Sequence, residues 1–489
     1  MNNAIRHTWV VSVALFLSLF AALSLIQVAL SDELNSHPQN ARQTIANAGA
    51  PRGPITVDGS PIAESVPAEH SQYDYQRVYN DPELYSGITG FFSVVEGSPG
   101  GLEQTLNDYL SGQSDAQFFD RITSLFTAQT MQGAQVELTL DAELQRQAYD
   151  MIPEGQRGTI IVTDVTTGDV RAMVSKPTYD TNLLAVHSGS DFQENMEQVQ
   201  GIEGLSPYRS RALNVPIAPG STFKLVDTLA MLESGDYEVD TELDNPNEIQ
   251  LPQSTNTLEN LATGACLEQS EAEFSWIFAN SCNTPFAEAA MELGEDAILE
   301  AAERFGWNDS DVSIPLGVTE SVFPELGSDA ELALSSIGQL NVTATAMQMN
   351  MAAAAIANGG EMMQPQLVDT IRGSDLQILE QPSPEVLNDV MDSSTAADMT
   401  DMMVETVESG TGWRAQSGRF DVAAKTGTAE RWDETGQDAG TVNSWITGFA
   451  PADDPQYAVT VVYEGIDMST GSELTGSQML SMLEAVIEE

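Results

Sequence analysis

A serine and a lysine in this sequence are spaced to act together as a nucleophile and its base. Ser221 and Lys224 follow the turn-forming pair Pro219-Gly220, and the apolar pattern after them predicts a helix that ends at Gly235. A separation of three residues places both side chains on one side of a helix. An uncharged lysine amine can accept the proton of a serine hydroxyl, which arginine cannot do. The start of the helix also offers backbone N–H groups to an oxyanion.

Lysine is rare in this chain, and its positions are therefore informative. Of the 18 basic residues, three are lysines, namely Lys176, Lys224 and Lys425. A Ser-x-x-Lys pattern also arises by chance on solvated helices. Here only Lys224 has a serine three residues before it, which favours the catalytic interpretation.

Ser281 and Asn283 lie on a predicted connection between two helices. A helix-like run covers residues 274–279, and Pro285 is typical of the first turn of a second helix. A serine and an amide two residues apart on such a connection can point into one cleft. The alternative is an ordinary turn, and the similar segment Ser254-Thr-Asn256 lies in a polar loop without a helix boundary.

A third group of residues, Lys425, Thr426, Gly427 and Thr428, follows a predicted strand over residues 420–424. A strand of this kind can lie beside an extended peptide, while the lysine supplies positive potential. The glycine permits a close approach of the two backbones. The alternative is a solvated strand end.

The three groups, in this order, resemble the signature of the penicillin-recognising serine enzymes. Nearly the whole chain is similar to class B penicillin-binding proteins of the actinobacterial PbpA type. Family-like contexts surround the first two groups, at Ala218–Lys224 and Ala279–Phe286. Upstream, Gly101–Glu103 and Leu138–Asp141 resemble parts of the family's N-terminal pedestal.

The resemblance implies a peptidoglycan D,D-transpeptidase. Ser221 would attack the carbonyl of the penultimate D-Ala of a stem peptide, release the terminal D-Ala, and form an acyl-enzyme that a second stem peptide's amine resolves. Lys224 would be the general base. Ser281 would relay a proton to the leaving amine, and Asn283 would bind the substrate amide and the lysine.

The same resemblance assigns the substrate carboxylate to Lys425, Thr426 and Thr428, with Gly427 between them. The backbone N–H groups of Ser221 and Thr428 would form the oxyanion hole, and β-lactams would acylate the serine as substrate mimics. No cofactor or metal is implied, because the four histidines are scattered without ligand spacing.

Three other activities share these motifs: a serine β-lactamase, a D,D-carboxypeptidase that uses water as acceptor, and a catalytically idle scaffold or β-lactam sensor. The segment Glu103–Asn107 imitates a class A β-lactamase signature, but it precedes Ser221, so the order is wrong. A carboxypeptidase usually has a shorter chain without a pedestal. The three intact motifs argue against an idle scaffold.

The N-terminal region predicts a membrane anchor. Residues 9–30 contain no charge, and a helix of this length spans a bilayer. Arg6 precedes the run, and Asp32 and Glu33 follow it, which predicts a cytoplasmic N-terminus and an extracytoplasmic remainder. The alternative is a cleaved signal peptide. The resemblance adds a membrane-embedded glycan polymerase as a possible partner.

Export places the two cysteines, Cys266 and Cys282, in an oxidising compartment. They can form one disulfide that closes a short loop. Two buried free thiols are the alternative.

The pattern of elements predicts an α+β fold. Strands over residues 159–165 and 170–174 are matched by strands near the C-terminus over 442–449 and 457–463, so one sheet would combine both ends. We also predict helices over residues 101–110, 141–151, 285–294, 331–358 and 473–488, and a strand over 136–140. The predicted organisation is a cytoplasmic tail (1–8), an anchor (9–30), a pedestal or dimerisation-like domain (31–155) and a penicillin-binding transpeptidase domain (156–489).

Composition limits the remaining possibilities. The 489 residues are 42% hydrophobic, enough for a sizeable core, and carry a formal net charge of −55. Such a field repels phosphate backbones, which argues against nucleic-acid binding, and makes anionic lipid headgroups poor partners. An acidic surface with few lysines leads to the hypothesis of a saline habitat, because salt screens the self-repulsion.

Overall fold

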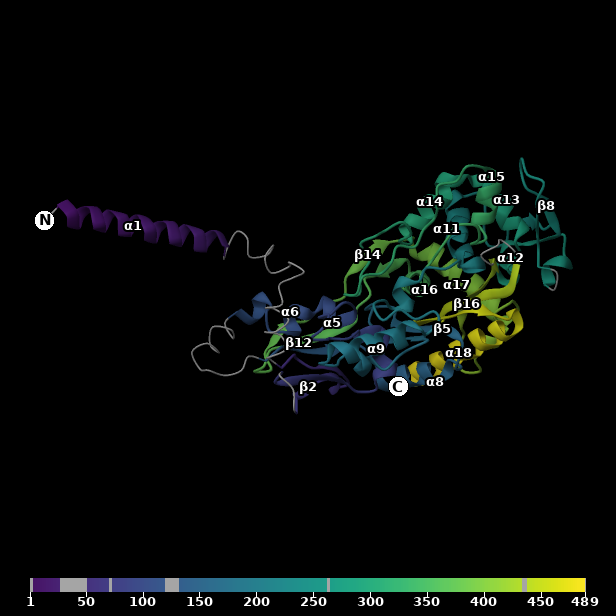
Figure 1. Cartoon of the computed structure of the whole chain (residues 1–489). Helices are drawn as coiled ribbons and strands as arrows, with labels where there is room; N and C mark the ends of the chain where they lie inside the picture. The colour runs from purple at the N-terminus through teal and green to yellow at the C-terminus, as the bar shows by residue number, and fades with distance from the viewer. Residues whose placement is uncertain are drawn as a thin grey trace.

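The structure, a computed structural model of the chain, describes residues 3–26, 51–69, 73–118, 132–261, 264–432 and 438–488. Outside the N-terminal helix, these residues form an elongated body (Figure 1). A six-stranded sheet lies towards one end of it, a five-stranded sheet lies in the middle, and helices cover both. The fold is α+β, as the sequence predicts.

The N-terminal helix α1 (Asn3–Ser24) contains a segment, Ile5–Ser24, that is long and apolar enough to cross a membrane. Its large apolar side chains are exposed, including Trp9 and Phe16. Such exposure fits a helix whose surroundings are lipid rather than water. The helix begins before the predicted anchor, whose residues 27–30 lie outside the described residues.

The N-terminal region, which we call the pedestal, is built on a six-stranded sheet with the order β13-β12-β4-β1-β2-β3. β1 and β4 pair in parallel, whereas the other neighbours are antiparallel. Two of the strands, β12 and β13, come from the part of the chain predicted as catalytic, so this sheet ties the two regions together. The domain boundary after residue 155 stays a prediction. The strands are β1 (Ile55–Val57), β2 (Ser60–Pro67), β3 (Tyr75–Tyr79), β4 (Gln135–Leu138), β12 (Val368–Arg372) and β13 (Ile378–Glu380).

Short helices complete the pedestal: α4 (Pro82–Thr89), α5 (Gly101–Thr105), α6 (Asn107–Leu110) and η2 (Asp115–Gln117). The predicted helix over 101–110 is thus present as two short pieces. The predicted strand and helix around residue 140 are also confirmed, as β4 and α8 (Ala142–Met151). Asp141 lies at the start of α8 and accepts hydrogen bonds from the backbone N–H groups of Glu143 and Leu144.

A buried ion cluster joins α5 to the pedestal sheet. Glu103 is fully buried, and its carboxylate accepts from Arg52 at 2.7 Å and from Arg77 at 2.6 Å. The hydroxyl of Tyr79 donates to the same carboxylate at 3.2 Å. Burial alone would raise the pKa of Glu103, but the two guanidinium groups hold it below its usual value. The carboxylate is therefore charged and fully paired inside the pedestal.

The five-stranded sheet has the order β15-β16-β17-β5-β6, and all its neighbours are antiparallel. It combines strands from both ends of the catalytic region, as the sequence predicts. β15 starts at Ala423, so the strand predicted over residues 420–424 begins too early. The strands are β5 (Arg157–Asp164), β6 (Val170–Lys176), β15 (Ala423–Trp432), β16 (Asp438–Ala450) and β17 (Tyr457–Ile466).

Both faces of this sheet are covered. Alternate residues of β5 belong to different apolar clusters: Ile160 and Val162 pack with α8 and α18 (Met468–Glu488), whereas Ile161 belongs to the cluster of α16 (Ala346–Ala357). The predicted helix over 473–488 is confirmed within α18. Apolar side chains therefore pack on both faces of the sheet, and β15 lies at its edge.

One predicted helix is wrong in its extent. The stretch 331–358 is divided into α15 (Asp329–Ser335) and α16, with Gly338 and Leu340 at positive φ between them. Backbone contacts cause the break: Gly220 N–H donates to the Gly338 carbonyl at 3.0 Å, and a Cβ at Gly338 would lie 2.0 Å from the Gly220 carbonyl oxygen. The interruption thereby supports the turn that carries Ser221.

The other elements are helices and small hairpins, and the predicted helix over 285–294 is confirmed as α13. The helices are α9 (Gly189–Gln200), α10 (Arg211–Asn214), α11 (Lys224–Ser234), α12 (Phe274–Asn280), α13 (Thr284–Leu293), α14 (Glu295–Arg304), α17 (Ser393–Glu408), η3 (Thr181–Leu183), η4 (Gly220–Phe223), η5 (Ala265–Leu267) and η6 (Trp413–Ala415). The two-stranded pairs are β7 (Glu242–Asp244) with β10 (Glu271–Glu273), β8 (Glu248–Gln250) with β9 (Thr257–Glu259), and β11 (Glu361–Met363) with β14 (Val386–Asp389).

Candidate active site

Ser221 lies in the 3₁₀ turn η4, directly before α11. Gly220 has a φ of 55°, and a Cβ there would lie 2.5 Å from the carbonyl oxygen of Thr428. A Cβ at Gly427 would in turn lie 2.7 Å from the Pro219 carbonyl oxygen. Both glycines are therefore required, because the serine turn and strand β15 touch backbone to backbone.

Lys224 begins α11, and its side chain is fully buried. The amine donates to the carbonyl oxygens of Ser281 at 2.8 Å and Cys282 at 2.9 Å, and to Asn283 Oδ1 at 2.9 Å. Burial, and secondly the charge of Lys425, hold the pKa of Lys224 well below its usual value. The residue thus meets the main requirement for a lysine base, which is a tendency to lose its proton.

The loop between α12 and α13 presents Ser281 and Asn283. Ser281 has a φ of 59° and ends α12, so its hydroxyl turns towards the second lysine. Asn283 is fixed by Asn260, whose side-chain oxygen accepts from its backbone N–H at 2.6 Å. Asn260 is buried and was not predicted from the sequence, because it is 23 residues away from the motif that it supports.

A disulfide joins Cys266 to Cys282, the middle residue of this loop. The two cysteines are 16 positions apart in the sequence, and a disulfide that closes a loop of about that length contributes roughly 3 kcal/mol to stability. It therefore restrains the segment that positions Ser281 and Asn283. Of the two alternatives left by the sequence, the structure has the bonded one.

Lys425 approaches the same hydroxyl from strand β15. Its amine donates to Ser281 Oγ at 2.8 Å and to the Thr426 carbonyl at 3.1 Å. Burial lowers the pKa of Lys425 to about 7. The neighbouring Thr426 hydroxyl lies 2.6 Å from that of Thr411, which was not predicted and which precedes η6. Ser281 is thus the link between the two buried lysines.

One cavity of about 360 Å³ collects the predicted residues. Its lining includes Ser221, Ser281, Asn283, Thr426, Gly427 and Thr428. Lys224 and Lys425 are buried next to the cavity, and both amines donate to the hydroxyl of Ser281, which lines it. Because β15 is an edge strand, its backbone can pair with an extended peptide lying in this cavity. The sequence motifs therefore meet at one site.

One expected contact differs. Within the described residues, the hydrogen bonds of Lys224 go to residues 281–283, and none joins its amine to the Ser221 hydroxyl. Hydrogen bonds between catalytic groups often shorten only in the substrate complex. The serine turn itself is firmly placed, because the indole of Trp445 donates to the Ala218 carbonyl at 3.0 Å.

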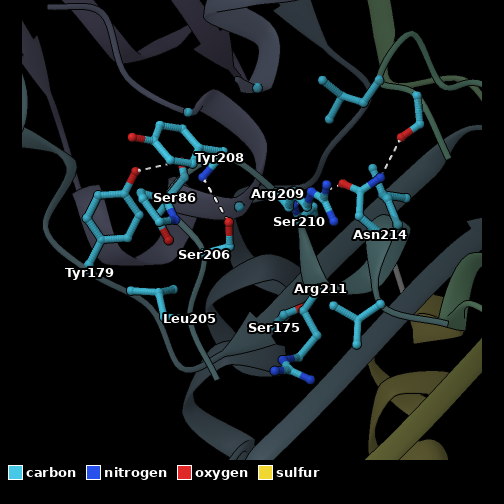
Figure 2. A pocket seen from close by; sticks show the side chains of 18 of the residues that line it. Ser86, Ser175, Tyr179, Leu205, Ser206, Tyr208, Arg209, Ser210, Arg211 and Asn214 are labelled. Carbon is cyan, nitrogen blue, oxygen red and sulfur yellow. Dashed lines mark hydrogen bonds between the residues drawn. The ribbon is translucent and has the colours of Figure 1, made fainter. Parts of the chain in front are cut away.

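A second cavity, shown in Figure 2, is larger but chemically unsuited to this role. Its volume is about 470 Å³, and it lies between the pedestal helices α4 and α5 and residues 204–215. The titratable side chains that line it are Tyr179, Tyr208, Arg209 and Arg211. Burial raises the pKa of both tyrosines, so neither hydroxyl can serve as a base near neutral pH.

Comparison with known families and proteins agrees with this geometry. Residues 158–483 match the penicillin binding protein transpeptidase domain, and residues 52–136 match the penicillin binding protein A dimerisation domain. The chain is 35% identical over 470 residues to peptidoglycan D,D-transpeptidase PbpA of Mycolicibacterium smegmatis, which covers 95% of this chain and 94% of that protein.

Solved structures agree as well. The crystal structure of PBPA from Mycobacterium tuberculosis has a TM-score of 0.84 at 31% identity, covering 90% of this chain and 100% of that one. The penicillin G acyl-enzyme complex of penicillin-binding protein A from M. tuberculosis has a TM-score of 0.81 at 32% identity, covering 90% of this chain and 99% of that one. With its three motifs gathered around one cavity and nearly its full length aligned to these relatives, the chain belongs to the PbpA family of penicillin-binding transpeptidases.

Proposed function

We propose that this chain cross-links peptidoglycan stem peptides as a D,D-transpeptidase with Ser221 as its nucleophile. Ser221 Oγ attacks the carbonyl carbon of the penultimate D-Ala, and the amide bond to the terminal D-Ala breaks. Lys224 accepts the hydroxyl proton, and Ser281 passes a proton to the leaving amine. An amine of a second stem peptide then attacks the ester, which restores the serine and forms the cross-link.

The observation that carries this proposal is the pair of buried lysines on either side of Ser281. The environment of Lys224 favours the uncharged amine. Its amine donates to the carbonyl oxygen of Ser281, and Ser281 lines the same cavity as Ser221. The close backbone contact of Gly220 with Thr428 supports an oxyanion hole formed by the N–H groups of Ser221 and Thr428. Loss of one such donor typically costs about 3 kcal/mol in the transition state.

The proposed setting is the outer face of a membrane. Helix α1 is the anchor, and Arg6 at its start favours a cytoplasmic N-terminus. The disulfide Cys266–Cys282 supports an extracytoplasmic catalytic region, because disulfides persist in oxidising compartments. A membrane-embedded glycan polymerase is the proposed partner, reached through α1.

Product analysis tests the activity. The detergent-solubilised full-length chain is incubated with a stem peptide ending in D-Ala-D-Ala and an acceptor amine, and the products are separated by mass. We expect a cross-linked dimer together with one released D-Ala per bond formed. Release of D-Ala with hydrolysed peptide alone would identify a carboxypeptidase. Penicillin labelling without any turnover would identify a β-lactam sensor; either outcome contradicts the proposal.

The charge of Lys425 predicts how substrate binding depends on pH. With a pKa of about 7, this lysine is positive below that pH and uncharged above it. The carboxylate of penicillin should therefore bind more weakly as pH rises from about 6 to about 8, by about tenfold for the loss of one charged hydrogen bond. The dissociation constant, separated from the acylation rate in stopped-flow measurements, gives this value.

Lys425→Arg is the matched control for this effect. Arginine keeps its charge throughout the range, so binding by the variant should not decline in this way. A dissociation constant that stays the same across the range in the unaltered chain would contradict the assignment of the substrate carboxylate to Lys425.

A further inference from the structure

The cavity shown in Figure 2 lies where the pedestal meets the catalytic region, and its walls come from both. Gly87 of α4 and Gly101 of α5 line it from the pedestal, and much of segment 204–215 lines it from the other side. The two sides touch closely, because a Cβ at Gly100 would lie 2.7 Å from the carbonyl oxygen of Tyr208. Junctions between regions of a chain are frequent places for ligand sites.

The charge of this junction cavity is opposite to that of the whole chain. The described residues that line it include two arginines and no aspartate or glutamate, although the chain has a formal net charge of −55. Arg211 is balanced by an ion pair with Glu464, and it also donates to the Gly204 carbonyl at 2.6 Å. The side chain of Arg209, in contrast, has no hydrogen bond or ion pair with another described residue. Its positive charge is therefore available to an anionic ligand.

The other walls offer fixed polar groups and one exposed aromatic ring. The side-chain oxygen of Asn214 accepts from the Ser210 backbone N–H at 3.1 Å, and its side-chain nitrogen donates to the Gly317 carbonyl at 2.9 Å. The hydroxyl of Tyr208 donates to Glu96 at 3.3 Å, while 37% of the residue stays exposed. A ring held at its hydroxyl presents an apolar face on which a sugar ring can pack.

Size and chemistry together indicate the class of ligand. The volume of about 470 Å³ exceeds the 360 Å³ of the active-site cavity and lies in the usual range of ligand sites, about 300–1,000 Å³. A small inorganic anion would leave most of this space unfilled. A guanidinium group binds a carboxylate through paired hydrogen bonds. Stem peptides end in a carboxylate and are attached to sugars, so they match both the arginine and the walls.

We propose that the junction cavity is a second binding site for the carboxylate-bearing stem peptide of a glycan strand, with Arg209 as the ligand of the carboxylate. The inference rests on the proposed function, which supplies this polymer as the substrate. A strand carries several stem peptides, so one can be held here while another reacts at Ser221. Two linked contacts raise the affinity for a strand above that for a single stem peptide.

Calorimetric titration of the acylated chain tests this site. Penicillin G is first attached to the full-length chain in detergent, which closes the active site to other ligands. A short strand fragment with stem peptides ending in D-Ala-D-Ala should still bind. Arg209→Gln should weaken this binding about tenfold, the effect of one lost charge-assisted hydrogen bond. Its melting temperature should not change, because Arg209 has no partner to lose.

The fragment itself provides a matched chemical control. When its peptide carboxylates are converted to amides, the unaltered chain should bind it about tenfold more weakly. Arg209→Gln should then cause no further loss, because the arginine and the carboxylate act on each other. A further tenfold loss for the amidated fragment would contradict the assignment of the carboxylate to Arg209.

Two more variants separate the cavity from the general charge of the surface. The first contact of a Cβ at Gly87 would be Ser210 Oγ at 3.6 Å, so Gly87→Leu can fill the cavity while Arg209 remains, and binding should be lost. Arg419→Gln removes an exposed charge outside the cavity and should bind like the unaltered chain.

Three results would overturn the inference: an acylated chain that does not bind the fragment, equal binding by Arg209→Gln and the unaltered chain, or full binding by Gly87→Leu. Failure of the proposed function is distinct, because penicillin would then not attach to Ser221. Failure of the second site leaves that attachment intact.

Discussion

Ser221→Ala will abolish the covalent attachment of penicillin. Ser221 lies in the turn η4 and lines the cavity. Ser281 and Asn283 line it as well, and both accept a hydrogen bond from the buried amine of Lys224. Alanine at this point leaves the oxyanion donors and the lysines in place but removes the atom that forms the acyl bond. Loss of the nucleophile of a serine enzyme reduces turnover by about 10⁶-fold. Fluorescent penicillin, followed on a denaturing gel, measures the effect directly.

Ser254→Ala is the matched control for that experiment. Ser254 belongs to the second Ser-x-Asn segment of the sequence, and its hydroxyl accepts from the backbone N–H of Asn256 at 3.0 Å in an exposed loop. This variant should be labelled like the unaltered chain. Equal labelling of Ser221→Ala and the unaltered chain, with equal melting temperatures, would mean that another residue is the nucleophile.

The candidate catalytic residues could be selected from the sequence because each motif is decided by local structure. Ser221 and Lys224 are positioned by a turn followed by a helix. The sequence signals for this turn and this helix lie within a few residues of each other. Ser281 lies between the end of one helix and the start of the next. An apolar run marks the first helix in the sequence, and Pro285 marks the start of the second. The resemblance to a known family then joined these local predictions into one site, which the local patterns alone could not do.

The features that the sequence did not predict depend on contacts between distant segments. The predicted helix over 331–358 runs through residues 336–345, but the chain leaves the helical path there, where the Gly338 carbonyl accepts from Gly220 N–H and Ala344 pairs with Ile217. Strand β12 joins the pedestal sheet from more than two hundred residues away, which no local pattern indicates.

The second prediction with a large expected effect concerns the stability of the pedestal. Glu103→Ala should lower the free energy of unfolding by about 3–5 kcal/mol, the usual cost of removing one partner of a buried ion pair. Two guanidinium groups, of Arg52 and Arg77, would remain buried without a carboxylate, and the hydroxyl of Tyr79 would lose its acceptor. Chemical unfolding of the full-length chain in detergent, at neutral pH, measures the difference.

The pH dependence of this cluster has a defined sign. The pKa of Glu103 is lower in the folded chain than its ordinary value of 4.5. The stability that it contributes is therefore complete above that value, and it is lost as pH falls through the folded pKa. Glu103→Ala should consequently unfold more easily at neutral pH, and its difference from the unaltered chain should shrink in acid.

Glu154→Ala provides the matched control, because it removes the same atoms from a solvent-exposed glutamate. Glu154 bonds to Lys176 at 2.8 Å, but its side chain is 90% exposed, so water replaces the lost partner. The Lys176 amine keeps its hydrogen bond to the Ile152 carbonyl at 2.9 Å, so we expect a loss of about 1 kcal/mol. A Glu103→Ala chain that unfolds within the same margin as Glu154→Ala would show that the pedestal does not depend on its buried charges. The connection through β12 would then have to be the main support of the catalytic region, since that strand pairs with β4 whatever the state of Glu103.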